Sequence, residues 1–370
     1  MKQNEIIYQI FPRNYSKEGT FKQITKDLER IRDLGVNIIY LMPIHEIGVK
    51  NRKGTYGSPY AIKDYYSISK DLGRLTDFKK LVKETHRFGM KIILDMVFNH
   101  TAPDNVLLKN HEDYYYHKNG KLGNRVGDWS DIVDLDTYKK ETQDYLLDVL
   151  KYWVSLGVDG FRFDVASMIP LSFFKRAREE LKDIIFIGES IDFNFHDYLV
   201  SIGDKPTNDD DMFPTFDSLY NYNFFHELFG YFKNKNGLDI IVKRLSQDQA
   251  NLRLLCLENH DTERIVNQVN KLGLERLLDF YSFIKGQLFI YAGQEYGNDH
   301  KPELFEKDPV DFSYKNEEIA MLYRKCIADK KAQKEIISSN YALVDKYSIK
   351  VVNLYVDGTK EERIFNLNLN

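Results

Sequence analysis

The chain has 370 residues and a nearly balanced charge, with 52 Lys and Arg against 56 Asp and Glu and a net charge of −4. Neither half carries a basic block, so the composition does not indicate binding to nucleic acid or to an anionic membrane. The N-terminal segment has no apolar run as long as that of a signal peptide and no later segment reaches the length of a membrane span, so we expect a cytoplasmic protein.

Short apolar runs alternate with amphipathic stretches along the chain. The pattern predicts strands over residues 6–11, 36–43, 91–98, 158–164, 184–189, 213–217, 252–258 and 287–293. It predicts helices between them, over residues 20–35, 76–89, 142–157, 170–182 and 224–235. Eight strands with intervening helices favour an α/β fold of the closed (β/α)₈ TIM-barrel type over an open doubly wound sheet.

Two segments stand outside this alternation. Residues 100–137 form a long irregular connection after the third strand, which is typical of a functional loop or a small inserted subdomain. The tail from about residue 341 has alternating polarity and contains Asp-Gly, a hairpin signal. We therefore predict a catalytic barrel over residues 1–99 and 138–336, an inserted subdomain over 100–137, and a reduced C-terminal β segment over 337–370.

The segment GFRFD, residues 160–164, places charged side chains inside an apolar strand. Because side chains alternate across a strand, Gly160, Arg162 and Asp164 share one face while Phe161 and Phe163 share the other. Buried charge is costly unless it is paired. At this point two interpretations are open, a structural Arg–Asp pair and a catalytic site.

Other polar residues follow the neighbouring strands. In a barrel of this kind, the chemistry lies where strands end and the following loops begin. These positions are occupied by Asp95, Asn99, His100, Arg162, Asp164, Glu189, Asn259, His260 and Asp261. One acid at a strand end is most often a solvated loop residue or a helix cap, but several acids in different strand–helix units indicate a site.

Paired carboxylates are what retaining glycoside hydrolysis requires. One attacks the sugar carbon, while the other protonates the leaving oxygen and later activates water. The attacking acid must be ionised, and the neighbouring Arg162 favours that form of Asp164. The proton donor must hold its proton near neutral pH, and Glu189, at the end of the apolar run IIFIGE, suits that role. The pattern therefore predicts Asp164 as a nucleophile.

The segments that carry these residues resemble the motifs of the alpha-amylase family of glycoside hydrolases. They read DMVFNH (95–100), GFRFD (160–164), IGE (187–189) and ENHD (258–261), in the order of the family. TYGSPYAIKDYYSI (55–68) and IYAGQEYG (290–297) are similar to the family's segments around strands two and eight. The resemblance runs from about residue 7 to residue 311 and implies a (β/α)₈ barrel that acts on an α-glucan.

By this resemblance, Asp164 is the nucleophile, Glu189 the acid/base, and Asp261 a third carboxylate that distorts and holds the reacting sugar. Two histidines would bind hydroxyls of that sugar, a tyrosine ring would stack on it, an arginine would orient the nucleophile, and an acid would support the site. These substrate-binding residues are, in that order, His100 and His260, Tyr60, Arg162 and Asp95.

The sequence also departs from the family pattern. Starch-cleaving members often carry Lys-His where this chain has Ser167-Met168, which affects the leaving-side contacts and a calcium site. Asn99 and Asp134 match two other positions of that calcium site, but two oxygen ligands are too few for bound Ca²⁺. We therefore predict no cofactor and no metal, with a structural calcium through these two residues as the alternative.

The first hypothesis is a retaining hydrolase that cleaves α-1,4 bonds of maltooligosaccharides, starch or glycogen. An α-1,6-glucosidase, which Val165 after the nucleophile weakly indicates, and a transglycosylase remain alternatives within the family. A barrel that binds glucan without cleaving it is disfavoured, because all three acids are present. No early G-x-G-x-x-G indicates an oxidoreductase, no H-E-x-x-H indicates a metal hydrolase, and Cys256 and Cys326 lack metal or redox spacing. The oligomeric state stays open.

Overall fold

The computed structural model describes residues 1–127, 129–220, 222–233, 235–247 and 252–369. Residue 128 of the predicted insertion, residue 234 of a predicted helix and residue 370 of the predicted C-terminal segment lie outside these ranges. Within them, eight parallel strands pair in the order β12-β11-β10-β5-β2-β1-β14-β13. A parallel bridge between Leu219 and Arg253 connects the two ends of this order, so the sheet forms a nearly closed barrel.

The barrel strands are short and buried, as expected of a parallel sheet covered on its outer face by helices. Their bounds are β1 Ile6–Ile10, β2 Ile38–Leu41, β5 Lys91–Met96, β10 Gly160–Phe163, β11 Ile185–Gly188, β12 Ser218–Leu219, β13 Leu254–Cys256 and β14 Gln287–Tyr291. The predicted TIM-barrel fold is confirmed.

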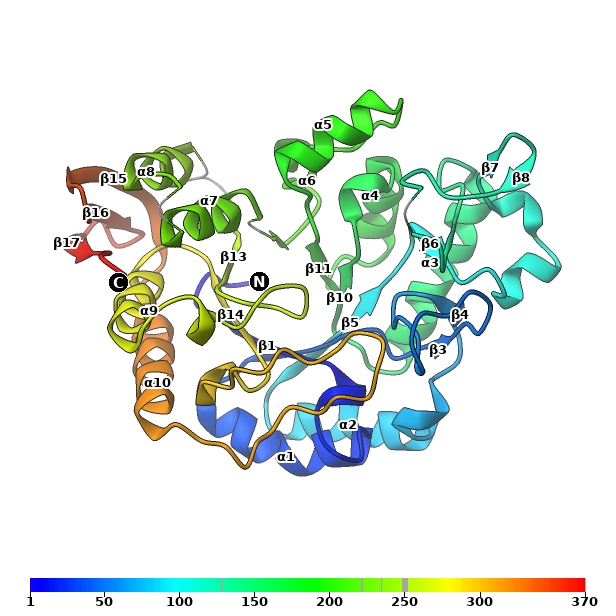
Figure 1. Ribbon diagram of the computed structural model, residues 1–370, viewed down its shortest axis with the longest axis horizontal. Helices are drawn as coiled ribbons and strands as arrows, with labels where there is room; N and C mark the ends of the chain where they lie inside the picture. Colours follow the sequence, from blue (N-terminus) through cyan, green and yellow to red (C-terminus); the bar gives the residue numbers. More distant parts are fainter. Residues whose placement is uncertain (128, 221, 234, 248–251, 370) are drawn as a thin grey trace.

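Helices surround the ring of strands (Figure 1). They are α1 Phe21–Leu34, α2 Leu75–Arg87, α3 Lys140–Ser155, α4 Leu171–Glu180, α5 Phe193–Ser201, α6 Asp209–Met212, α7 Tyr222–Phe232, α8 Leu238–Gln247, α9 Lys271–Phe283 and α10 Glu317–Ala332. Short 3₁₀ helices cover Pro12–Asn14, Lys70–Leu72, Val106–Lys109, Glu112–Tyr114, Ala166–Met168, Ile265–Asn267 and Gln294–Tyr296. Helix α1 shows why they pack: Phe21, Ile24, Leu28 and Ile31 recur at helical spacing and are all buried. Among the described helices, none is both long and apolar enough to cross a membrane.

Strand β10 shows how the two faces of the barrel wall differ. Phe163 points outward and packs on Phe174 of α4 with ring centroids 4.9 Å apart. Gly160 and Arg162 point inward, and a Cβ on Gly160 would lie 2.6 Å from the Cβ of Ile185 on the neighbouring strand. The alternation predicted from GFRFD is therefore correct, and the charged face of the strand is the barrel interior.

The sixth strand is the one whose predicted position is wrong. The sequence indicated residues 213–217, but the strand is β12, Ser218–Leu219. Asn208 caps the short helix α6 through the N–H of Asp211, and Phe213 continues it with helical backbone angles. Phe216 is nevertheless buried in the main core, so the apolar residues that indicated a strand pack from a helical turn instead.

Smaller sheets extend the loops at the carboxyl end of the barrel. They are the pairs β3 Glu46–Ile47 with β4 Ile62–Asp64, β6 His100–Thr101 with β9 Val133–Asp134, and β7 His117–Lys118 with β8 Lys121–Leu122. The chain ends in an antiparallel sheet of β15 Ile336–Asp345, β16 Ser348–Tyr355 and β17 Lys360–Asn366, beside α8 and α9 (Figure 1). The domain boundaries assigned from the sequence stay predictions.

Candidate active site

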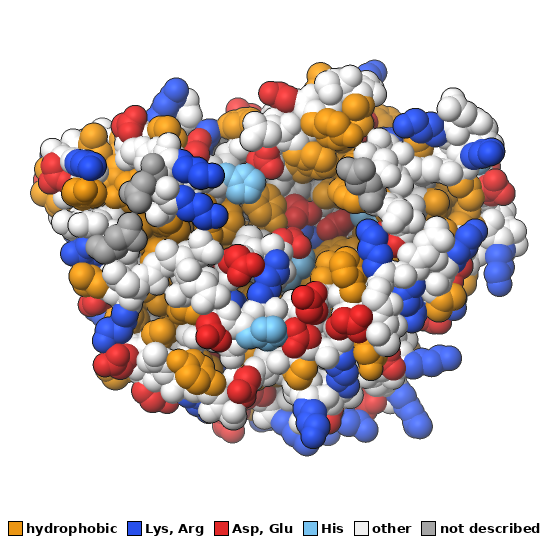
Figure 2. Space-filling model, viewed as in Figure 1, with side chains coloured by type: hydrophobic (Ala, Val, Ile, Leu, Met, Phe, Trp, Pro, Cys, Tyr) orange, Lys and Arg blue, Asp and Glu red, His pale blue; other side chains and the backbone are white. Residues whose placement is uncertain are grey.

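A pocket opens at the carboxyl end of the barrel. Its walls come from the loops that follow strands β2, β5, β10, β11, β13 and β14, and its lining includes Tyr60, His100, Asp164, Glu189, His260 and Asp261. Figure 2 shows a hollow near the centre of this face, with acidic and histidine side chains inside it. Asp95 and Arg162 lie beneath the lining and are buried. The structure thus brings together all eight residues predicted for the site.

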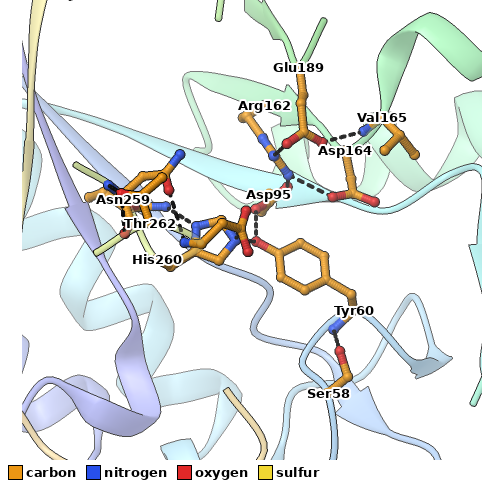
Figure 3. A network of polar contacts seen from close by, with 12 residues as sticks. Ser58, Tyr60, Asp95, Arg162, Asp164, Val165, Glu189, Asn259, His260 and Thr262 are labelled. Atoms are coloured by element: carbon orange, nitrogen blue, oxygen red, sulfur yellow. Dashed lines mark hydrogen bonds and ion pairs between the residues drawn. The ribbon is translucent and has the colours of Figure 1, made fainter. Parts of the chain in front are cut away.

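Arg162 is the centre of the charged network (Figure 3). Its Nη1 donates to Asp95 Oδ1 at 2.7 Å and to Asp164 Oδ1 at 2.9 Å, while Nη2 lies 2.7 Å from Glu189 Oε1. Strand register explains the arrangement, because Arg162 is paired with Asp95 on β5 and with Ile187, two residues before Glu189, on β11. One guanidinium therefore contacts three carboxylates from three adjacent strands.

Glu189 is held at both oxygens. Its Oε2 accepts a hydrogen bond from the backbone N–H of Val165 at 2.7 Å, and its Oε1 accepts one from the hydroxyl of Tyr222 at 3.1 Å. Val165 has a φ of +37°, which a β-branched residue rarely adopts, and this conformation is found directly after Asp164. The unusual backbone conformation thus coincides with an N–H that binds the neighbouring acid, as strained residues at functional sites often do.

Tyr60 and His260 form a second polar layer beside the acids. The Tyr60 hydroxyl lies 3.0 Å from Asp95 Oδ2 and 2.7 Å from His260 Nε2, and the two rings stack 5.4 Å apart. Gln9 contacts the other nitrogen of His260 at 2.9 Å, and Tyr40 donates to Asp95 Oδ2 at 2.6 Å. Ring and carboxylate orientations are therefore set by several contacts each.

The two histidines are neutral near pH 7. Burial lowers the pKa of His100 to about 4 despite the carboxylate of Asp131. Burial, together with the positive charge of Arg162, also lowers the pKa of His260 to about 4. A neutral imidazole has one donor and one acceptor nitrogen, so each ring is suited to hydrogen bonding with a hydroxyl group.

Asp164 and Glu189 form an interacting pair. Burial and the negative charge of Glu189 raise the pKa of Asp164 well above its ordinary value, and Arg162 only partly offsets them. Arg162 thus favours the ionised form of Asp164, as the sequence indicated, but does not dominate. Two acids that share one guanidinium can hold one proton and one negative charge between them near neutral pH.

Asp261 lies at the mouth of the pocket. Burial raises its pKa, while the charges of Arg162 and Lys301 lower it. The pKa is raised overall, and because half of the side chain surface is exposed, solvent screens the charges of Arg162 and Lys301. Its Oδ2 lies 3.1 Å from His260 Nε2. Asp261 thus lines the pocket beside His260 and is accessible to solvent.

Asn99 and Asp134, which matched a calcium site, lie behind the pocket. Asn99 Oδ1 and Asp134 Oδ1 are buried without a hydrogen-bond partner, while Asp134 Oδ2 accepts from the backbone N–H of Arg125 at 2.8 Å and from its Nη1 at 3.2 Å. The guanidinium thus already supplies a positive charge, and two free oxygens fall short of the six to eight that Ca²⁺ takes. Within the described residues no cluster of His, Cys, Asp or Glu could hold a metal. The expectation of no bound metal stays a prediction.

Several residues of the site were not predicted from the sequence. Tyr222, Trp129, Lys53 and Asp131 contact or line the pocket, and none belongs to a motif that the sequence singled out. Tyr40 could have been found, because strand alternation places it on the inner face beside Asp95. Trp129, Lys53 and Asp131 reach the pocket from loops whose path the sequence does not reveal, and Tyr222 reaches it from the start of α7.

The chain is similar to known proteins over most of its length. The family model described as the alpha amylase catalytic domain matches residues 9–130 and 124–342. The crystal structure of an alpha-amylase from Lactobacillus plantarum is 36% identical, with a TM-score of 0.93 over 99% of this chain and 89% of that one. That of a noncanonic maltogenic alpha-amylase from Thermotoga neapolitana is 32% identical, with a TM-score of 0.87 over 100% and 87%.

Curated relatives carry several different names. An alpha-1,4-glucan:maltose-1-phosphate maltosyltransferase of Picrophilus torridus is 31% identical over 50% of this chain, and the match spans only 32% of that relative's length. An alpha-glucosidase of Pediococcus pentosaceus is 26% identical over 89% of this chain and 71% of its own. With the family model matching most of the sequence, the chain belongs to the alpha-amylase family of glycoside hydrolases.

Proposed function

We propose that the protein is a retaining α-glucan hydrolase that cleaves α-1,4-glucosidic bonds of maltooligosaccharides, starch or glycogen. The observation that carries the proposal is the contact of one buried guanidinium, that of Arg162, with Asp95, Asp164 and Glu189 at the base of an open pocket. Retaining glycosidases need a nucleophile and an acid/base on either side of the reacting carbon, about 5 to 5.5 Å apart. Two acids bridged by one planar guanidinium suit that spacing.

Asp164 is the nucleophile in this proposal. Arg162 binds its Oδ1, and the other carboxylate oxygen points away from the guanidinium (Figure 3). That oxygen forms a bond to the anomeric carbon while the bond from this carbon to the glycosidic oxygen breaks. Glu189 transfers its proton to the leaving oxygen, and then takes a proton from the water that attacks the same carbon and releases Asp164.

The remaining residues hold the sugar. Tyr60 offers a ring face on which a glucose unit stacks, and neutral His100 and His260 bind hydroxyl groups. Asp261, partly exposed at the mouth of the pocket, accepts hydrogen bonds from the hydroxyls of the distorted ring. Relatives named cyclomaltodextrinase and alpha-amylase support an α-1,4-glucan as the substrate.

The test compares the wild-type protein with Glu189→Gln on maltoheptaose and on isomaltotriose. Glu29→Gln, an exposed glutamate on α1, is the matched control. We expect α-anomeric products from maltoheptaose by NMR, a loss of about 10²- to 10⁴-fold in Glu189→Gln, and no loss in the control. Mass spectrometry after reaction with 5-fluoro-α-D-glucosyl fluoride should show a sugar attached to Asp164.

Four outcomes contradict parts of this proposal. Products of β configuration would refute the retaining mechanism, and a label on another residue would refute the role of Asp164. Cleavage of isomaltotriose in place of maltoheptaose would make the protein an α-1,6-glucosidase, and one relative is named oligo-1,6-glucosidase. Cleavage of neither sugar would refute hydrolysis of both bond types.

A further inference from the structure

The pocket has two unlike ends. Glu189 and Val165 lie at one end and Ser58 with the backbone of Tyr60 at the other (Figure 3). If Glu189 protonates the leaving oxygen, the reducing-end part of the glucan lies on the side of Glu189. The part that stays on the enzyme, which carries the non-reducing end, then points toward Ser58 and the residues next to it.

A loop over residues 51–57 closes the Ser58 end, and the first of its contacts go to the segment before β9. The ammonium of Lys53 lies 2.8 Å from Asp131 Oδ1, and the side chain of Asn51 donates to the carbonyl of Ser130 at 3.3 Å. Asp131 is buried, and both partners of the ion pair line the pocket. The pair thus joins two loops across one end of the pocket.

The same loop is tied on its other side to residues 304–306. The backbone N–H of Thr55 donates to Glu306 Oε1 at 2.8 Å, and that of Tyr56 donates to the carbonyl of Phe305 at 3.0 Å. At Gly54, with a φ of +63°, a Cβ would lie 2.7 Å from the Cβ of Phe305, so only glycine permits this approach. Three loops therefore form one connected wall around the Ser58 end.

A buried arginine supports this wall from below. Arg13 is 5% exposed and donates to the carbonyl of Gly57 through both terminal nitrogens, at 3.1 and 3.2 Å, and also to the carbonyl of Leu304. A charged group bound to two carbonyls on different loops makes their separation costly. The wall is thus a built part of the site, stabilised from within the protein.

The Glu189 end is different, because residues that follow Glu189 and Tyr222 closely in the chain line a second cavity. It is lined by Ile191 and Phe193 after β11 and by Asn223 at the start of α7, directly after Tyr222, which contacts Glu189. The side chain of Phe193 is 56% exposed. Space and an apolar ring are therefore available where the leaving part of a glucan would extend.

We infer that the protein acts from the non-reducing end of its glucan and releases glucose or maltose. The wall that contains the Lys53–Asp131 ion pair leaves no room for a longer sugar segment on the non-reducing side of the cleaved bond. This inference rests on the proposed hydrolase function. The substrate class is a maltooligosaccharide with an unmodified non-reducing end. The reducing-end part of the chain extends into the cavity beside Glu189.

The test uses p-nitrophenyl α-maltoheptaoside with and without a 4,6-O-ethylidene group on its non-reducing glucose, with products followed by chromatography. We expect cleavage of the free substrate to glucose or maltose from the first time points, and cleavage of the blocked substrate slower by about 50-fold or more. Equal rates, or an initial spread of internal products, would overturn the inference while leaving the hydrolase function intact. Cleavage of neither substrate would count against the proposed function itself.

A variant tests the wall directly. Lys53→Ala removes the ion pair, so the cleavage rate of the blocked substrate divided by that of the free substrate should rise by about tenfold or more. Lys63→Ala removes the pair of Lys63 with Glu46, 3.0 Å apart on β4 and β3, and should leave that ratio unchanged. An unchanged ratio in Lys53→Ala, with the variant folded by circular dichroism, would refute the barrier role of this pair.

Discussion

Replacing Arg125 by Met should destabilise the protein in a way that depends on pH. The Arg125 guanidinium lies 3.2 Å from Asp134 Oδ2 and 4.7 Å from the ring centre of Tyr116, and the two charged side chains are 12% and 1% exposed. Burial raises the pKa of Asp134 to about 6, and Arg125 lowers it from a still higher value. Because Asp134 is paired with His100 between β9 and β6, the change also affects one wall of the active site.

The expected size follows from proton linkage. The pKa of Asp134 is about 6 in the folded wild-type protein and about 3.9 in an unfolded chain. Between about pH 4 and pH 6 the unfolded chain has therefore lost this proton while the folded protein still holds it, so the free energy of unfolding falls as pH rises. Above about pH 6 the residue causes no further change. Without Arg125 the pKa rises further and the decline continues. Each pH unit above about 6 lowers the free energy of unfolding of the variant by about 1.4 kcal/mol. The variant is therefore less stable than the wild type by about 1.4 kcal/mol more at pH 7. If the pKa of Asp134 in the variant is at least 8, this difference is about 2.7 kcal/mol at pH 8.

The assay is urea unfolding followed by fluorescence at pH 5, 7 and 8. At pH 5 Asp134 is largely protonated in both proteins, so the remaining loss reports the packing of Arg125 on Tyr116 and its contacts with the carbonyl of Leu135 at 3.5 Å. The control is Lys140→Met, which removes an exposed pair with Asp144 on α3 and should change stability little at any of these pH values. In the double variant Arg125→Met/Asp134→Asn, the added pH dependence should disappear.

Two results would refute this reasoning. A loss of the same size at pH 5 and pH 8 would show that the guanidinium does not stabilise the protein through ionised Asp134. A double variant with the full pH dependence would show that another acid titrates. Restoration of Arg125→Met by added Ca²⁺ but not by Mg²⁺ would instead show that Asn99 and Asp134 bind a metal once the guanidinium is absent, which is the alternative that the sequence left open.

Two further changes test the site and the barrel. Lys301→Met removes a charge that lowers the pKa of Asp261, so the acidic limb of the kcat/KM profile should move to higher pH. The shift should be less than about one pH unit, because Asp261 is half exposed. A shift to lower pH would contradict this prediction. Gly160→Ala should lower stability by about 1–3 kcal/mol in thermal unfolding, since its methyl would meet Ile185 at 2.6 Å. Gly123→Ala, with no atom closer than 3.5 Å, is the control, and equal losses would refute the clash.

The predicted strands depended on local apolar patterns, and seven of the eight overlap the observed barrel strands. The failure at residues 213–217 has a clear cause. Phe213 and Phe216 are as apolar as residues of a strand, but Asn208 starts a helical turn before them. Local composition cannot distinguish a short buried strand from a buried turn, because both need the same apolar side chains.

The sequence by itself determined the barrel class and predicted which acids lie together. Alternation along residues 160–164 and acids after the fourth, fifth and seventh strands place Asp164, Glu189 and Asp261 at one rim, since parallel strands end on the same side. Only the tertiary structure decided how these groups interact. Arg162 contacts acids from two other strands, Tyr222 reaches Glu189, and Lys53 closes the pocket on Asp131. Such contacts join residues far apart in the chain, and their distances depend on loop paths and strand register that no local pattern specifies.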